Sequence, residues 1–175
     1  EPIRLVWSAR WEYDKGPDRL LAILQQLKKR NVPFEIAILG EQFRSIPKEF
    51  EEIKQSFSNQ ITQFGYANHR QDYLDCLAHA DIVLSTALHE FQGLAVLEAV
   101  ALGCVPVLPN RQVYPELFGD QYLYQSQLES IENEAKSAVD LIIKTMTDNP
   151  PAPTAKPFQI EALLPQYRSL IQAMK

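Results

Sequence analysis

The sequence alternates short apolar runs with stretches of helical periodicity, and this rhythm constrains the fold more than any other feature. Each run is rich in β-branched and apolar residues, and in the stretch that follows, apolar side chains recur at intervals of three and four residues. The strands and helices predicted in this way are 3–7 then 18–30, 34–39 then 47–57, 61–64 then 69–80, 81–85 then 93–102, and 104–108. Strands that alternate with helices form a parallel sheet.

The predicted strands are apolar on both faces, and this indicates where the helices lie. Strands buried on both faces read as continuous apolar runs, whereas strands with one wet face alternate. We therefore expect an α/β fold, a Rossmann-like parallel sheet with helices on both faces, around one hydrophobic core that a chain of 175 residues can fill. Ligands of such sheets bind in the loops that follow the carboxyl ends of the strands.

The distribution of proline divides the chain into three parts. Residues 1–147 hold the strand and helix pattern, which closes with an apolar helix face over 131–146. Residues 148–157 contain four of the chain's twelve prolines, so no helix continues through them and we expect a Pro-rich linker. Apolar residues return at helical spacing over 158–175, which predicts a C-terminal amphipathic helix after the linker.

Charge and cysteine usage exclude several classes of protein. The chain has 22 acidic and 17 basic residues, a net charge of −5, whereas a surface that binds by covering nucleic-acid phosphates carries a clustered basic excess. No apolar run approaches the length of a membrane span, so no membrane partner is expected. Cys76 and Cys104 lie in apolar surroundings and are expected to be two buried thiols, which suits a reducing, cytoplasmic location.

Two cations occupy the loop after the first predicted strand. Arg10 and Lys15 stand there at the edge of the sheet where a ligand binds. Arginine offers a planar fork of donors and lysine a point charge, a combination that suits the oxygens of a diphosphate. The alternative is a pair of solvated loop charges beside Glu12 and Asp14.

Two glutamates and a glycine surround the helix start predicted after the fourth strand. A helix that begins near Gly93 has free N–H groups that can hold a phosphate, and glycine lets the phosphate come close. Glu90 and Glu98 are up to ~12 Å apart along a continuous helix, which exceeds the ~6.5–9.5 Å between the carboxyls of an inverting glycoside hydrolase. One ligand lying lengthwise, with a hydroxyl-bearing group at each end and phosphates between, fits better. Alternatively, Glu98 is a partly buried helix residue paired with a neighbour.

Taken in order and spacing, these residues resemble the C-terminal, donor-binding domain of the GT-B glycosyltransferases of family 4. The resemblance covers about residues 3–147 and implies the C-terminal half of a GT-B fold. Its motifs are Arg10, Lys15-Gly16, Gly40, Gly65, Ala80-Asp81, Glu90-x7-Glu98 and Gly103-x-x-Pro106. Ala9 departs from the pattern, because many family members have glycine there.

The resemblance implies roles for the charged residues. Arg10 and Lys15 would hold the donor diphosphate and offset the charge that grows on the leaving group. Glu90 would bind the sugar hydroxyls, and these three residues are the expected catalytic set. Glu98 would hold the nucleotide ribose. No Asp-X-Asp motif is present, so we expect no metal and no other cofactor, with Arg10 and Lys15 in the metal's electrostatic role.

The resemblance also implies a wider donor-binding set. The turn at Gly65 and Tyr66 would lie against the base, unless it is an ordinary strand-ending turn with a surface tyrosine. His89 would touch the donor, unless it is only structural. The complete expected donor-binding set is Gly65, Tyr66, His89, Phe91, Gln92, Gly93, Leu94 and Glu98, in which Phe91 to Leu94 supply backbone amides.

A narrower resemblance concerns the group of this family that transfers mannose to queuosine in tRNA. It rests on Arg10-Trp11-Glu12, Asp14-Lys15, His89-Glu90-Phe91, Leu97-Glu98-Ala99-Val100 and Val113-Tyr114-Pro115-Glu116. It implies a GDP-mannose donor, transfer with retention, and a tRNA acceptor bound by an N-terminal domain outside this chain. The charge of −5 then argues only against this half as the main RNA-binding surface.

Two other functions remain open at this stage. One is a family 4 enzyme that glycosylates a lipid-linked or cell-surface carbohydrate from another sugar nucleotide. The other is a non-catalytic α/β module, either a nucleotide sensor or a signalling receiver domain. A receiver requires an acidic cluster and a phosphoacceptor aspartate after its first strands, where this chain has Arg10, Gly40 and Gly65.

Overall fold

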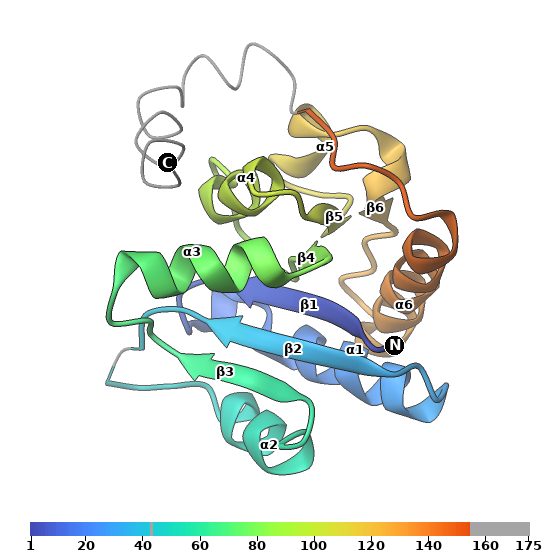
Figure 1. Ribbon diagram of the computed structural model, residues 1–175. Coiled ribbons are helices and arrows are strands. Elements are labelled where there is room, and N and C mark those ends of the chain that lie inside the picture. The colour runs from blue at the N-terminus through green and yellow to red at the C-terminus, as the bar shows by residue number, and fades with distance from the viewer. Residues whose placement is uncertain (43, 155–175) are drawn as a thin grey trace.

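A six-stranded parallel sheet forms the centre of the protein, in a computed structural model that describes residues 1–42 and 44–154 (Figure 1). Its spatial order is β3-β2-β1-β4-β5-β6. The strands are β1 (Ile3–Ser8), β2 (Phe34–Leu39), β3 (Ile61–Gly65), β4 (Ile82–Leu84), β5 (Val105–Pro109) and β6 (Leu123–Tyr124). The prediction of a Rossmann-like α/β fold is confirmed. Strand β6 was not predicted, because two residues carry no readable periodicity.

The helices follow the strands as the periodicity predicted. They are α1 (Pro17–Lys29), α2 (Glu49–Ser56), α3 (Arg70–His79), α4 (Leu94–Ala101), α5 (Tyr114–Leu117) and α6 (Ile131–Asp148), with 3₁₀ turns η1 (Tyr13–Lys15) and η2 (Asp120–Tyr122). The short helix α5 and both 3₁₀ turns were not predicted. Helix α6 ends where the proline-rich segment begins, and the helix predicted over 158–175 lies outside the described residues.

The sheet separates two buried clusters rather than enclosing the single core that was expected. Helices α1, α2 and α6 cover one face, and α3, α4 and α5 cover the other (Figure 1). Neighbouring residues of β1 point to opposite clusters, with Leu5 and Trp7 in the first and Val6 in the second. Because β1, β2, β4 and β5 contribute to both clusters, they read as continuous apolar runs, whereas Ile61 and Phe64 of the edge strand β3 pack on the first cluster.

Local signals explain why α1 begins and ends where it does. Gly16 adopts a left-handed conformation with φ of 70° and caps the helix, and Pro17 occupies its first turn. Leu20, Leu24 and Leu27 are fully buried on its inner face. These features hold the loop before α1 in place, and that loop carries Arg10 and Lys15.

The two cysteines are free thiols in different surroundings. Cys104 is fully buried, and burial raises the pKa of its thiol to about 12. Cys76 is only half-buried, so the expectation of two buried thiols is correct for Cys104 alone. Among the described residues, no helix is both long and apolar enough to cross a bilayer.

The order of the strands determines where a site can form. The chain winds outwards from β1 to β2 and β3, then crosses back from β3 to β4 on the other side of β1 and continues outwards to β5 and β6, so the direction of winding reverses between β1 and β4. Ligands of doubly wound sheets bind beyond the carboxyl ends of the strands at such a reversal.

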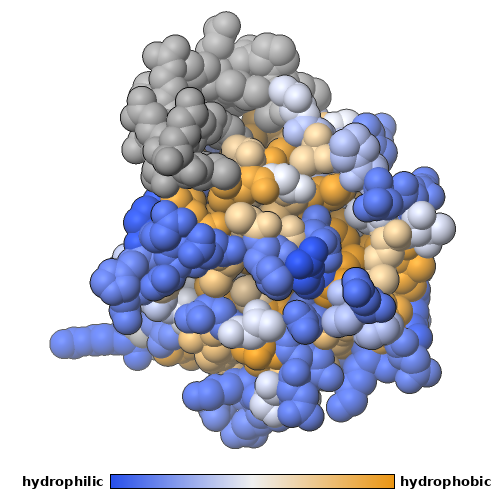
Figure 2. All heavy atoms as spheres, in the orientation of Figure 1, coloured by the Kyte–Doolittle hydropathy of each residue, from blue (hydrophilic) through white to orange (hydrophobic). Residues whose placement is uncertain are grey.

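On the surface seen in Figure 2, hydrophilic side chains gather around α2 and the N-terminal end of α3, and hydrophobic residues are visible between the elements.

Candidate functional site

A cavity of about 530 Å³ lies at the carboxyl edge of the sheet, between the loops after β1 and β4 and the first turns of α4. It brings together most of the residues that the sequence singled out. Its lining is Ser8, Ala9, Arg10, Lys15, Glu90, Phe91, Gln92, Leu94, Ala95 and Glu98. Four predicted residues are not part of this lining, namely Gly65, Tyr66, His89 and Gly93.

Lys15 is a buried cation with two partners from the opposite loop. Its side chain is 9% exposed, and Nζ donates a hydrogen bond to the carbonyl oxygen of His89 at 2.8 Å. The same nitrogen lies 3.4 Å from Oε2 of Glu90. The carboxylate of Asp14 is more distant, at 4.0 Å. An ammonium group held in this way beside a cavity can attract the oxygens of an anionic ligand.

Backbone hydrogen bonds tie the two loops to each other. The N–H groups of Leu88 and His89 both donate to the carbonyl oxygen of Asp14, at 2.8 and 3.2 Å. The Thr86 hydroxyl donates to the carbonyl oxygen of Lys15 at 2.8 Å. The position of Lys15 relative to Glu90 is therefore determined by contacts between the backbones of the loops as well as by the ion pair.

Arg10 occupies a more open position than Lys15. Its side chain is 55% exposed, and Nη2 lies 3.7 Å from the carboxylate of Glu12. This pairing agrees with the alternative of solvated loop charges, although Arg10 also lines the cavity. An exposed pair of this kind contributes little to stability and is easily exchanged for another anion.

Glu98 lies on α4 at the other end of the cavity and is held by two residues of α3. Its side chain is 14% exposed and lies 3.4 Å from Nη2 of Arg70. The Tyr73 hydroxyl donates to Oε2 of Glu98 at 3.0 Å and contacts the Ser8 hydroxyl at the same distance. Burial, with the neighbouring Glu98 charge, raises the pKa of Tyr73, so the phenol stays a donor. Glu98 is therefore both paired and open to the cavity.

Gly93 begins α4 as the sequence predicted, and the place of its missing side chain lies against α5. The residue has a φ of 68°, which favours glycine, and a Cβ atom added there would lie 3.0 Å from Cδ1 of Leu117. The space that glycine leaves is filled by α5 and does not face the cavity. Helix α4 has no acidic residue in its first turn and no side-chain cap, so its first N–H groups remain suited to an anion.

A smaller pocket of about 270 Å³ adjoins Glu98. It is lined by Gly40, Tyr66, Ala67, Asn68, Arg70 and Tyr73. Tyr66 is 64% exposed, and Gly65 accepts a hydrogen bond from the N–H of Gly40 at 3.2 Å. Because Arg70 and Tyr73 contact both this pocket and Glu98, one ligand could reach from Glu98 towards Tyr66. His89 is exposed, and its contact with the site is through its carbonyl oxygen.

Several residues around the site were missed by the sequence reasoning. Arg70 and Tyr73 lie on α3, where their helical positions gave no sign that they reach α4. Thr86 is fully buried between the loops. Two features of the sequence could have indicated further residues near the site. Arg111 stands in the loop after β5, at the ligand-binding edge, and Glu134 falls on the apolar face of α6.

No metal centre is visible in the part of the chain that the structure describes. Within residues 1–42 and 44–154, no three or more histidine, cysteine, aspartate or glutamate side chains are grouped as a metal ion would need. The electrostatic role expected of Arg10 and Lys15 remains a prediction.

The family is identified by comparison with known sequences. A family model described as glycosyl transferases group 1 matches residues 1–160. The chain is 45% identical over 124 residues to the tRNA-queuosine alpha-mannosyltransferase of Drosophila melanogaster, an alignment that covers 71% of this chain and 33% of that protein. The matched region is thus about a third of the length of this relative.

Solved structures support the same fold. The pneumococcal O-GlcNAc transferase GtfA in complex with UDP and GlcNAc superposes with a TM-score of 0.66 at 16% identity, covering 85% of this chain and 29% of that one. The catalytic domain of cholesterol-alpha-glucosyltransferase from Helicobacter pylori gives 0.61 at 19% identity, covering 85% and 90%. With its fold and its sequence in agreement, the chain belongs to the glycosyl transferases group 1 family and has the Rossmann-like architecture of one half of a GT-B glycosyltransferase.

Proposed function

We propose that this chain is the donor-binding domain of a retaining glycosyltransferase that uses GDP-mannose, and that the whole protein transfers mannose to queuosine in tRNA in the cytoplasm. One observation carries the proposal: a buried Lys15 ammonium held 3.4 Å from Glu90 in a cavity that ends at Glu98. The 45% identity to a tRNA-queuosine alpha-mannosyltransferase supports the choice of sugar and acceptor.

The reacting end of the donor would lie between the two loops. Lys15 and Arg10 would bind the diphosphate and offset the negative charge that accumulates on it as the glycosidic bond breaks. Lys15 is the stronger contributor, because its 9% exposure leaves little water to screen its charge. The carboxylate of Glu90 would accept hydrogen bonds from the sugar hydroxyls.

The nucleoside end would lie at α3 and α4. Glu98 would accept from the ribose hydroxyls, with Tyr73 keeping its carboxylate in position. The pocket beside Tyr66 would receive the base. The first N–H groups of α4 would contact the phosphates between these ends.

The tRNA would be bound mainly by parts of the protein other than this chain. A net charge of −5 does not favour phosphate contacts over a wide surface. In this proposal the chain supplies the activated sugar, and the acceptor reaches it at the open side of the cavity where Arg10 lies.

Isothermal titration calorimetry on this chain tests the donor assignment. We expect GDP and GDP-mannose to bind, and UDP and UDP-GlcNAc to bind clearly more weakly. Changing Lys15 to Met should weaken GDP binding, whereas Lys144→Met, on the exposed side of α6, should leave it unchanged. Equal or stronger binding of UDP would overturn the GDP-mannose assignment. Transfer of labelled mannose to tRNA by the whole protein, absent from tRNA without queuosine, tests the acceptor.

A further inference from the structure

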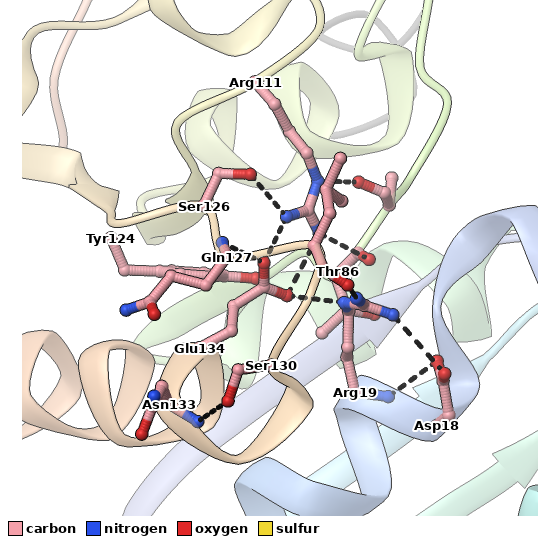
Figure 3. A network of polar contacts seen from close by, with 12 residues as sticks. Asp18, Arg19, Thr86, Arg111, Tyr124, Ser126, Gln127, Ser130, Asn133 and Glu134 are labelled. Carbon is pink, nitrogen blue, oxygen red and sulfur yellow. Dashed lines mark hydrogen bonds and ion pairs between the residues drawn. The ribbon is translucent and has the colours of Figure 1, made fainter.

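Behind the loop after β4 lies a group of buried charges that the proposed chemistry does not use (Figure 3). Glu134 of α6 is 1% exposed, and the side chains around it, Arg111 from the loop after β5 and Arg19 from α1, are 8% and 7% exposed. In Figure 3 the two guanidinium groups approach the Glu134 carboxylate from different sides. Three separate elements of the fold therefore meet at one carboxylate.

The Glu134 carboxylate has enough partners to hold Arg111 in a single orientation. Oε1 contacts Nη1 of Arg111 and accepts from the N–H of Gln127 at 2.9 Å. Oε2 lies 3.3 Å from Nη2 of Arg111 and 2.8 Å from Nε of Arg19. A two-point contact between guanidinium and carboxylate fixes the plane of the guanidinium group.

Of the remaining donors of Arg111, one on Nη1 contacts the Ser126 hydroxyl at 3.0 Å, and the other two reach the backbone of the loop that leads to Glu90. Nε donates to the carbonyl oxygen of Ala87 at 2.8 Å, and Nη2 to that of Thr86 at 3.2 Å. One side chain therefore joins the core of α6 to two consecutive peptide groups of this loop. A lysine at position 111 could not do this, because an ammonium group lacks the planar fork.

Thr86 transmits this contact to the other loop. Its hydroxyl accepts from Nε1 of Trp7 at 2.9 Å and donates to the carbonyl oxygen of Lys15 at 2.8 Å. A Cβ atom at Gly16 would lie 2.1 Å from the Thr86 carbonyl oxygen, so the two loops are in direct backbone contact here. The position of Thr86 therefore contributes to where Lys15 lies relative to Glu90.

We propose that Arg111 is a positioning residue for sugar transfer. Glu134 orients Arg111, and Arg111 holds the carbonyl groups of Thr86 and Ala87 and so sets the separation of Lys15 and Glu90. The inference rests on the proposed function, because it assumes that these loops bind a diphosphate sugar. Stability alone is a poor reason for such an arrangement, since apolar residues of the same volume often stabilise a protein as well as a buried ion pair does.

The test compares ligands that reach different ends of the site, in the whole enzyme. GMP would contact the nucleoside end alone, whereas GDP and GDP-mannose also reach the loops. In Arg111→Lys we expect the Kd of GDP and GDP-mannose to rise roughly 10- to 100-fold, the scale of weakening one hydrogen bond to a charged group, with the Kd of GMP unchanged within about twofold. The matched control is Arg30→Lys. It alters a different ion pair to α6, between Arg30, the residue after α1, and Asp140, and it should leave all three values unchanged.

The split between ligands separates positioning from stability. The variant Ile142→Val, in the core beside α1, should lower the melting temperature without altering the ratio of the GDP and GMP dissociation constants. If Arg111→Lys weakens GMP as much as GDP, or weakens neither, the inference is wrong. If it does not fold, Glu134→Gln must show the same split, and failure of both variants to fold would assign these residues to stability alone.

The donor assignment is tested independently in the unaltered enzyme. If that enzyme prefers uridine nucleotides, the proposed GDP-mannose donor is wrong. The same comparison then uses UMP, UDP and UDP-GlcNAc. The split between monophosphate and diphosphate remains the criterion for Arg111.

Discussion

Glu98 offers the sharpest separation of the two ends of the proposed site. We predict that Glu98→Gln weakens GDP itself, whereas Glu90→Gln weakens mainly the sugar-bearing donor. Glu98 is 14% exposed and already holds Tyr73 at 3.0 Å and Arg70 at 3.4 Å. A carboxylate accepts about four hydrogen bonds, so both of its oxygens can still receive a ribose hydroxyl.

The expected magnitude follows from the charge on this carboxylate. A hydrogen bond to a charged group contributes about 1.5–3 kcal/mol net, which corresponds to roughly 10- to 150-fold in Kd. The competing ion pair with Arg70 is half exposed and contributes at most about 1 kcal/mol, so it does not hide the effect. Glutamine keeps one acceptor oxygen without the charge, and we expect the lower end of the range.

Calorimetry with GDP and 2′-deoxy-GDP measures this effect. The unaltered chain should bind 2′-deoxy-GDP more weakly than GDP. In Glu98→Gln the two affinities should differ by about twofold or less, because the acceptor of the 2′-hydroxyl is already weakened. The exposed Glu116→Gln serves as the control and should behave like the unaltered chain. A GDP affinity unchanged in Glu98→Gln, or reduced more in Glu90→Gln, would refute the placement of the ribose.

Three further predictions concern the folded state. Leu24→Ala removes a fully buried side chain and should lower the free energy of unfolding in urea by about 2–5 kcal/mol, and a loss under about 1 kcal/mol would contradict the packing of α1. At pH 8 a thiol reagent should label Cys76 first. It should label Cys104 only as fast as the protein unfolds, because burial raises the pKa of that thiol to about 12. Early labelling of Cys104 would contradict its burial. Burial tends to raise the pKa of Asp81, but hydrogen bonds from Arg4 outweigh it and leave the folded pKa below the unfolded value of about 3.9. The Arg4–Asp81 pair therefore stabilises the protein above that pH, and this stabilisation is lost as the pH falls through the folded pKa of Asp81. Asp81→Asn should flatten the acid side of the curve of unfolding free energy against pH. An unchanged acid side would contradict the pairing.

The sequence was sufficient for most of the fold because most strands and helices are long enough to show their periodicity. The strand at Phe34–Leu39 was predicted with its exact bounds. Strand β6 and helix α5 were missed because two and four residues cannot display a period. The expectation of one core came from chain length and composition, which do not show that the sheet divides the buried residues into two clusters.

The site was predicted less completely than the fold. The sequence placed Lys15 at the correct edge of the sheet, but it could not show that the ammonium is buried and bonded to the carbonyl oxygen of His89. The contacts made by Arg111 and Tyr73 were not predictable, because they join residues that are distant in the chain. The sequence also could not show that a side chain at Gly93 would meet Leu117, while the expected approach of a phosphate there stays a prediction.

Two glycines restrict how the proposed donor site could be redesigned. A Cβ atom at Gly40 would lie 1.7 Å from the carbonyl oxygen of Ala9, next to Arg10, and one at Gly16 would lie 2.1 Å from that of Thr86. Loops from three different strands are thus fitted to one another along their backbones. A library that exchanges one of these loops for that of a relative must also keep both glycines and the length of the neighbouring loops. Changes at exposed side chains such as Tyr66 and Phe91 do not meet this restriction.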